Sequence, residues 1–156
     1  MTLTGQSDLS GTVTVSGGVL YAGNASSGSG TTIIDNDVTV SGGKLGGGGR
    51  ISGTVTVNSG SLVPGNSIGT LYIGGNLDLT SSSTTEIEFN ASASDKIVVS
   101  GDITVAGTII LKPENVTYAS TSYVIIDGSS DTSKNFSGSF STVTVSPTSN
   151  LNGATA

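Results

Sequence analysis

The hydrophobic and polar positions of this chain repeat as one short pattern. An apolar-Thr-apolar triplet is followed by a corner of Ser, Asn and Gly, and then by a second short apolar step. The pattern begins at Val13, Val38 and Val55, and it loosens at Leu77–Leu79 and Ile103–Val105. The triplets return at intervals of about 17 to 26 residues, which is typical of solenoids, where one unit buries its apolar side only by stacking on the next.

Short strands without intervening helices predict an all-β fold, because no useful segment has apolar residues at helical spacing. Propeller blades carry aromatic signatures and run about 40 to 50 residues, and neither feature is present. A sandwich needs hairpin turns such as Asn-Gly or Asp-Gly. These pairs occur only at Asp127-Gly128 and Asn152-Gly153, outside the repeat. We therefore predict a single-stranded parallel β-helix of about six or seven coils, with Val13, Val38 and Val55 stacked at about 4.8 Å.

The length of 156 residues predicts one domain. We expect repeat coils over residues 1–85, longer and better-packed coils over 86–145, and an unpatterned tail over 146–156. Four consecutive glycines at Gly46–Gly49 predict a corner, since glycine weakens a strand. Phe136 and Phe140 are expected to cap the C-terminal coil.

Composition excludes several functions. The net charge is −6, and the five basic residues are scattered, so we expect no nucleic-acid partner, which would need clustered cations. The chain has no Cys and no His, which excludes disulfides, thiol catalysis, Cys-ligated zinc and a histidine base. The basic residues are Lys44, Arg50, Lys96, Lys112 and Lys134.

Three patterns are candidates for binding. Asp35-Asn36-Asp37 is the nearest approach to a metal loop, but calcium takes six or more oxygens, so a polar corner is the favoured interpretation. Gly46–Gly49 lacks the Lys-Ser/Thr that follows in a phosphate-binding loop. The four tyrosines suit either surface binding anchors or covers for the core, and the sequence leaves both open. They are Tyr21, Tyr72, Tyr118 and Tyr123.

Glu86 and Glu88 form the one candidate catalytic pair. They stand two apart on a predicted strand, hence on one face, with Ile87 and Phe89 on the other. Paired carboxylates serve glycoside hydrolysis at suitable separation. A solvated surface is the favoured interpretation, because no aromatic sugar platform accompanies the pair. We therefore predict no catalytic, cofactor-binding or metal-binding residue and a protein that is not an enzyme.

Residues Leu62–Leu71 read LVPGNSIGTL, and Ser94–Gly101 read SDKIVVSG. These stretches, with the strand pair Ile103–Val105 and Thr108–Leu111 and a segment like Tyr118–Ile126, resemble the passenger-associated transport repeat of bacterial autotransporters. The resemblance covers about residues 36 to 145, and its PGNSIGTL core is fairly specific.

The resemblance implies a right-handed β-helix in a passenger domain of type V secretion, exported through a C-terminal outer-membrane barrel to the cell surface. We expect a stalk and folding nucleus of an adhesin, with that barrel, host surface or matrix molecules and other copies of the chain as partners. The 156 residues contain neither a signal sequence nor a barrel, so we expect a segment of a longer protein. The alternatives are a polysaccharide-processing enzyme and an adhesin exported by a separate partner barrel.

A stack of strands ends in unpaired edges, which pair readily with another chain. We therefore expect concentration-dependent self-association through residues 12–20, unless the first twelve residues cover that edge. The C-terminal end is expected to be protected by Phe136 and Phe140.

Overall fold

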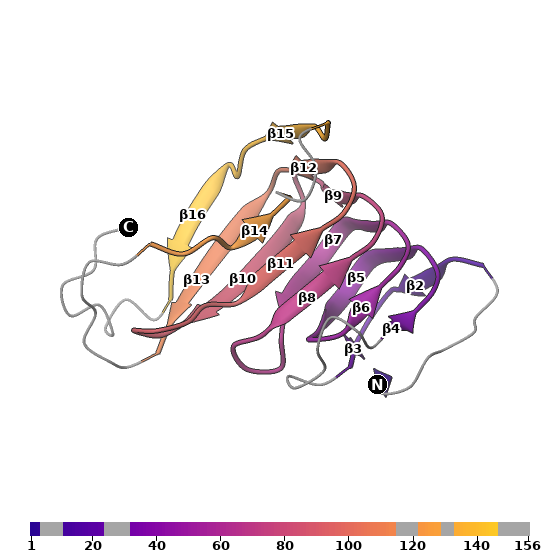
Figure 1. The fold of residues 1–156 in the computed structure, drawn as a ribbon, viewed down its shortest axis with the longest axis horizontal. Coiled ribbons are helices and arrows are strands. Elements are labelled where there is room, and N and C mark those ends of the chain that lie inside the picture. The colour runs from indigo at the N-terminus through magenta and orange to yellow at the C-terminus, as the bar shows by residue number, and fades with distance from the viewer. Residues whose placement is uncertain (4–10, 24–31, 115–121, 129–132, 147–156) are drawn as a thin grey trace.

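The computed structural model describes residues 1–3, 11–23, 32–114, 122–128 and 133–146 of the chain. Its secondary structure consists of strands, and no described helix is long and apolar enough to cross a membrane. All strand pairings between the described elements are parallel and lie in two sheets, as Figure 1 shows. Tyr118 and residues 147–156 of the expected tail lie outside the described residues.

The larger sheet has eleven strands and the smaller has five. The chain alternates between them, so that each circuit adds strands to the large sheet and then one strand to the small sheet. The large sheet contains β1 (Thr2–Leu3), β2 (Val13–Val15), β3 (Val19–Ala22), β5 (Val38–Gly47), β7 (Val55–Pro64), β9 (Leu77–Leu79), β10 (Ser83–Phe89), β12 (Ile103–Val105), β13 (Thr108–Pro113), β15 (Phe136–Gly138) and β16 (Thr142–Val145). The small sheet contains β4 (Thr32–Ile34), β6 (Arg50–Ile51), β8 (Thr70–Ile73), β11 (Lys96–Val99) and β14 (Ile126–Asp127).

The repeated triplets stack in register, which confirms that part of the prediction. Val13 pairs with Val38, and Val38 pairs with Val55. The column continues through Leu77 and Ile103, where the sequence pattern had loosened. Parallel neighbours in such a ladder stand about 4.8 Å apart, so equal side chains pack on equal side chains.

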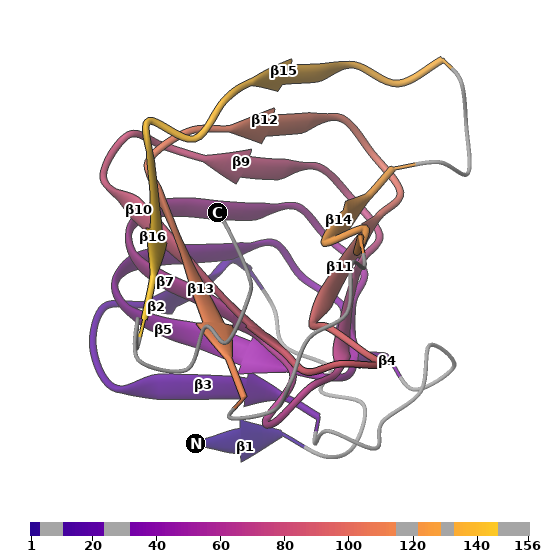
Figure 2. The ribbon, with the colours of Figure 1, turned by 90° about the vertical axis from the view of Figure 1, so that its left-hand side faces the viewer.

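The predicted fold class, a single-stranded right-handed parallel β-helix of six or seven coils, is corrected by the sheet topology. The described strands form one curled eleven-stranded sheet and a separate five-stranded sheet (Figure 2). The expected corner after the triplet is absent in β5 and β7, which each run through it as one ten-residue strand. The triplet and the apolar step after the corner were expected to form separate strands, but they are parts of one curled sheet.

Glycine explains why the strand bends there without ending. The register between β5 and β7 shifts between Val40 and Lys44, which marks an irregularity in the ladder. Gly60 has a φ of +93°, and a Cβ on it would collide with the backbone oxygen of Gly43. Glycine tolerates this conformation and this close approach without steric cost. The four-glycine segment behaves similarly, since Gly46 and Gly47 belong to β5 and only residues 48–49 bend.

One hydrophobic core lies between the two sheets. Its buried side chains come from both, and the fully buried ones include Leu45 and Leu62 of the large sheet and Leu71 and Ile97 of the small sheet. Val, Ile and Leu supply nearly all of this core, as the low aromatic content predicts.

Burial is deepest in the middle of the chain and falls toward its C-terminal part. Ile87, Ile97 and Ile109 are buried, but Val143 is 59% exposed. Phe140 packs against the core, whereas Phe136 is 61% exposed, so the expected protection of this end by Phe136 is wrong. The physical reason is that, within the part of the chain that the structure describes, β15 is paired on one side only, with β12.

Replacing Leu62 with Ala should lower the free energy of unfolding by about 2 to 5 kcal/mol, because a fully buried leucine leaves a cavity. The control is Val143→Ala, which removes methyl groups from an exposed side chain of the same large sheet and should cost about 0.5 kcal/mol or less. Chemical denaturation of both variants measures the difference. Equal costs would contradict the position of the core.

Candidate functional site

A buried carboxylate on the outer face of the large sheet is the first candidate. Glu86 of β10 accepts a hydrogen bond from Lys44 Nζ at 2.8 Å and a second from Lys112 Nζ. Lys44 comes from β5 and Lys112 from β13, so the three residues join widely separated parts of the sequence. β7 lies between β5 and β10, and its Ser61 is in register with Lys44.

The two lysines set the charge of this site. Burial of the Glu86 side chain, which is 8% exposed, by itself raises its pKa. The hydrogen bonds and positive charges of Lys112 and Lys44 outweigh burial and hold the pKa of Glu86 below its ordinary value. The carboxylate is therefore ionised at neutral pH and neutralised by its two partners.

The surroundings of Glu86 decide between the two interpretations of the pair Glu86 and Glu88. Glu86 and Glu88 do lie on the face of β10 opposite Ile87, but Glu86 is buried beneath two lysines and is not a solvated surface group. A general acid in glycoside hydrolysis needs a raised pKa, and that of Glu86 is lowered. Sequence reasoning missed Lys44 and Lys112, because only the strand register brings them to Glu86.

The second candidate is Asp95, which is fully buried and connects two neighbouring segments. Its Oδ1 accepts the N–H of Gly69 at 2.8 Å, and its Oδ2 accepts the N–H of Glu88 at 2.7 Å. The backbone N–H of Asp95 also donates to the carbonyl of Glu88 at 2.7 Å. One side chain thus fixes the loop before β8 to the end of β10.

The loop that Asp95 fixes is the Pro-Gly-Asn-Ser-Ile-Gly segment, residues 64–69. Gly65 and Gly47 exchange two backbone hydrogen bonds at 2.9 Å. Gly65 has a φ of +77°, and a Cβ on it would collide with the carbonyl oxygen of Ser67 and stand 3.1 Å from Asp95 Oδ1. Glycine is therefore required at this position both by its conformation and by the close approach of the Ser67 backbone.

Burial dominates the titration of Asp95. It raises the pKa of this carboxyl from 3.8 to about 7, although the two N–H donors favour the charged form and hold the pKa down. The folded protein therefore retains a proton on Asp95 over a pH range in which an unfolded chain has lost it.

The other candidates have structural partners. Asp37 Oδ1 accepts the N–H of Thr54 at 2.7 Å, and Asp35 Oδ1 accepts the hydroxyl of Ser52 at 3.2 Å. Among the described residues no group of three or more His, Cys, Asp or Glu side chains is placed to hold a metal ion. Gly46 lies beneath its neighbours, since a Cβ there would stand 2.5 Å from the carbonyl oxygen of Val63, so it forms no open phosphate cradle.

The described tyrosines are partly buried. Tyr123 donates its hydroxyl to the carbonyl of Asn90 at 2.6 Å, and its ring lies tilted against Phe89 with centroids 6.3 Å apart. The ring of Tyr21 lies over Gly46. These contacts favour the interpretation that Tyr123 and Tyr21 cover the core, and they disfavour a role as surface binding anchors.

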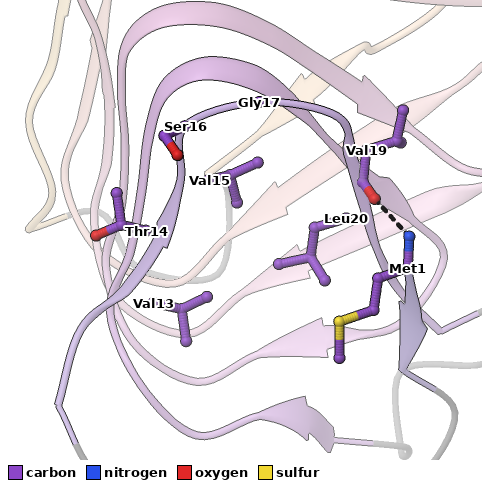
Figure 3. Close-up of a pocket in the computed structure, with 8 residues that line it drawn as sticks. All are labelled: Met1, Val13, Thr14, Val15, Ser16, Gly17, Val19 and Leu20. Atoms are coloured by element: carbon purple, nitrogen blue, oxygen red, sulfur yellow. Dashed lines mark hydrogen bonds between the residues drawn. The ribbon is translucent and has the colours of Figure 1, made fainter.

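The N-terminal end of the core forms an open groove of about 370 Å³ (Figure 3). The side chains of Val13, Val15 and Leu20 point into it, and Thr14 points away. Its lining is mostly apolar, with no charged side chain among the described residues that form it. The lining residues are Met1, Val13, Thr14, Val15, Ser16, Gly17, Val19 and Leu20.

Comparison of the chain with protein families, curated proteins and solved structures finds no match. The resemblance to the autotransporter repeat therefore depends on the residues of this sequence alone. It stays a prediction, and the function that follows from it is a proposal.

The stability of the fold should fall as pH rises from about 4 to about 7. The pKa of Asp95 is about 7 when folded and 3.8 as its ordinary value, so the folded state binds the extra proton in this interval. The expected loss is about 2 to 4 kcal/mol from this group. Denaturation of wild type and Asp95→Asn across this range isolates it, because asparagine does not titrate.

Asp95→Asn should be less stable than wild type at pH 4, since its amide nitrogen cannot accept the N–H of Glu88 or Gly69. The gap between the two proteins should narrow toward pH 7. A gap that stays constant, or widens as pH rises, contradicts the raised pKa of Asp95.

Proposed function

We propose that this chain is a non-enzymatic segment of an autotransporter passenger, exported across the outer membrane and displayed on the bacterial surface as the stalk and folding nucleus of an adhesin. The observation that carries the proposal is the contact made by Asp95. The two stretches with the strongest family resemblance, residues 62–71 and 94–101, are joined by its hydrogen bond to Gly69. The motif therefore acts as one structural unit.

The stacked circuits support a role in export. The described strands of each circuit pair only with those of its neighbours, so circuits can fold one at a time as they leave a pore, each on the one already formed. Folding outside the membrane then opposes backward sliding of the chain. The Asp95 contact spans two circuits, since it joins the loop before β8 to the residues before β11.

The pairing of Glu86 with two lysines supports the proposal that the chain is not an enzyme. Its carboxylate is bound by Lys44 and Lys112, whose side chains cover it from the solvent side of the sheet. Such a triad links β5, β10 and β13 across the outer face. We assign it a role in holding distant circuits together.

The full chain, placed between a signal peptide and the outer-membrane barrel of an unrelated autotransporter, tests the proposal in a Gram-negative host. Protease added to intact cells measures how much of the chain is displayed. Wild type should be displayed efficiently, and Asp95→Ala several-fold less. The matched control is Asp78→Ala, which removes a carboxylate from β9 and should leave display unchanged.

Equal display of wild type and Asp95→Ala would contradict the folding-nucleus role, provided that purified Asp95→Ala is measurably less stable. A separate screen of the purified chain against acidic and neutral glycans addresses the non-enzymatic part. Glycan cleavage that Glu86→Gln abolishes would overturn it.

A further inference from the structure

The two ends of the large sheet carry complementary edges. Among the described strands, β2 pairs only with β5 at the N-terminal end, and β15 pairs only with β12 at the C-terminal end. Each therefore has one side on which no described strand pairs. An unpaired strand edge presents N–H and C=O groups that are ready to bind another strand.

The hydrogen bond that joins the circuits is the same at every level. The first residue of each triplet donates its N–H to the carbonyl of the residue that precedes the next triplet. At the N-terminal edge the carbonyl of Thr12 holds this acceptor position, and at the C-terminal edge the N–H of Phe136 holds the donor position. The observed bonds are Val13 to Asp37 (2.9 Å), Val38 to Thr54 (2.8 Å), Val55 to Asn76 (2.9 Å), Leu77 to Asp102 (2.9 Å) and Ile103 to Asn135 (2.9 Å).

The two edges also agree in spacing. Val13 opens β2 and Val19 opens β3, a step of six residues; Phe136 opens β15 and Thr142 opens β16, again a step of six. Placing Phe136 over Val13 therefore places Thr142 over Val19. The same register sets Val143 over Leu20, Thr144 over Tyr21 and Val145 over Ala22.

Shape and polarity at the two ends match as well. Phe136 continues the inward-facing column of Val13, Val38 and Ile103 but is 61% exposed, because no described strand lies beyond it. The N-terminal end offers the apolar groove of about 370 Å³ in the same column (Figure 3). Seating Phe136 in this groove removes its exposed ring from water, and Val143, 59% exposed, adds further apolar surface to the contact.

Part of the N-terminal edge is covered by β1. Thr2 pairs with Tyr21 and Leu3 with Ala22, which are the positions that Thr144 and Val145 of a second copy would take. The amino group of Met1 donates to the carbonyl of Val19 at 2.7 Å. Thr2-Leu3 of β1 has the same Thr-apolar order as Thr144-Val145 of β16. β1 therefore occupies the edge of β3 that β16 of a second copy would need.

We propose that the chain associates head to tail, with β15 and β16 of one copy adding to β2 and β3 of the next and displacing β1. The contact continues the large sheet from copy to copy and seats Phe136 in the N-terminal groove. It uses a different surface on each partner, so it does not close into a dimer and builds an open series of oligomers. This inference does not depend on the proposed export role.

Sedimentation velocity over a concentration series tests the proposal with the full chain. Wild type should form oligomers that grow with concentration. Phe136→Asp and Val13→Lys, which block the two ends separately, should each stay monomeric. Thr56→Lys, a charge added to the outer side of β7 in the middle of the sheet, is the matched control and should associate as wild type does.

Leu3→Pro tests the competition by β1. Tyr21 donates its N–H to the carbonyl of Met1, so the parallel ladder assigns the next bond to the N–H of Leu3, which proline lacks. Releasing β1 should lower the concentration at which oligomers form by about tenfold or more, equivalent to about 1.4 kcal/mol.

A mixture of the two blocked variants separates head-to-tail contact from every other geometry. Phe136→Asp keeps an intact groove and Val13→Lys keeps an intact β15, so together they should form a complex of two chains that grows no further. Three results overturn the proposal: wild type and Leu3→Pro both monomeric at high concentration, oligomers that persist in Phe136→Asp, or a wild-type species that stops at two copies.

Discussion

The hydrogen-bonded ladder between successive circuits is the interaction on which the rest of the structure depends. Each circuit contributes only a thin layer of Val, Ile and Leu, and such a layer is buried only when another lies on each side of it. Val38 and Val55 have ladder neighbours on both sides and are fully buried. Val13 has one neighbour among the described strands and is partly exposed. The ladder therefore decides both where the core is complete and where the molecule is left open.

Sequence reasoning succeeded where a single repeated position carries the information. The Val-Thr-Val triplets predicted the register of β2, β5 and β7, because equal side chains recur at the spacing of one circuit. Sequence reasoning failed at the glycine-containing corners that follow the triplets. Glycine after the triplet was interpreted as the end of a strand, but Gly60 in a positive-φ conformation bends β7 without ending it. The predicted fold class was wrong for that reason.

The candidate site could be predicted only in part. Alternation along Glu86–Phe89 placed the two carboxylates on one face, as the structure has them. The lysines that bind Glu86 are 42 and 26 residues away in the sequence, so they become visible only when the strand register is known. The exposure of Phe136 likewise follows from the absence of a described strand beyond β15, which no local pattern encodes.

Function follows from the same ladder in our account. A stack that grows by one circuit at a time suits a chain that folds as it is exported, and Asp95 fixes the loop that carries the family resemblance to the neighbouring circuit. The stack also leaves edges whose donors, acceptors and spacing match each other. Export and self-association are thus two consequences of one arrangement, and they are tested independently.

Engineered disulfides measure the ladder most directly, because the natural chain has no cysteine. Thr39 and Thr56 are register partners on adjacent strands, and parallel neighbours about 4.8 Å apart lie within the reach of a disulfide. Thr39→Cys/Thr56→Cys should therefore close a disulfide under mild oxidation in the folded monomer. Thr39→Cys/Asp78→Cys, two strands apart in the same column, should not. Closure of the second pair in preference to the first would contradict the parallel, in-register stack.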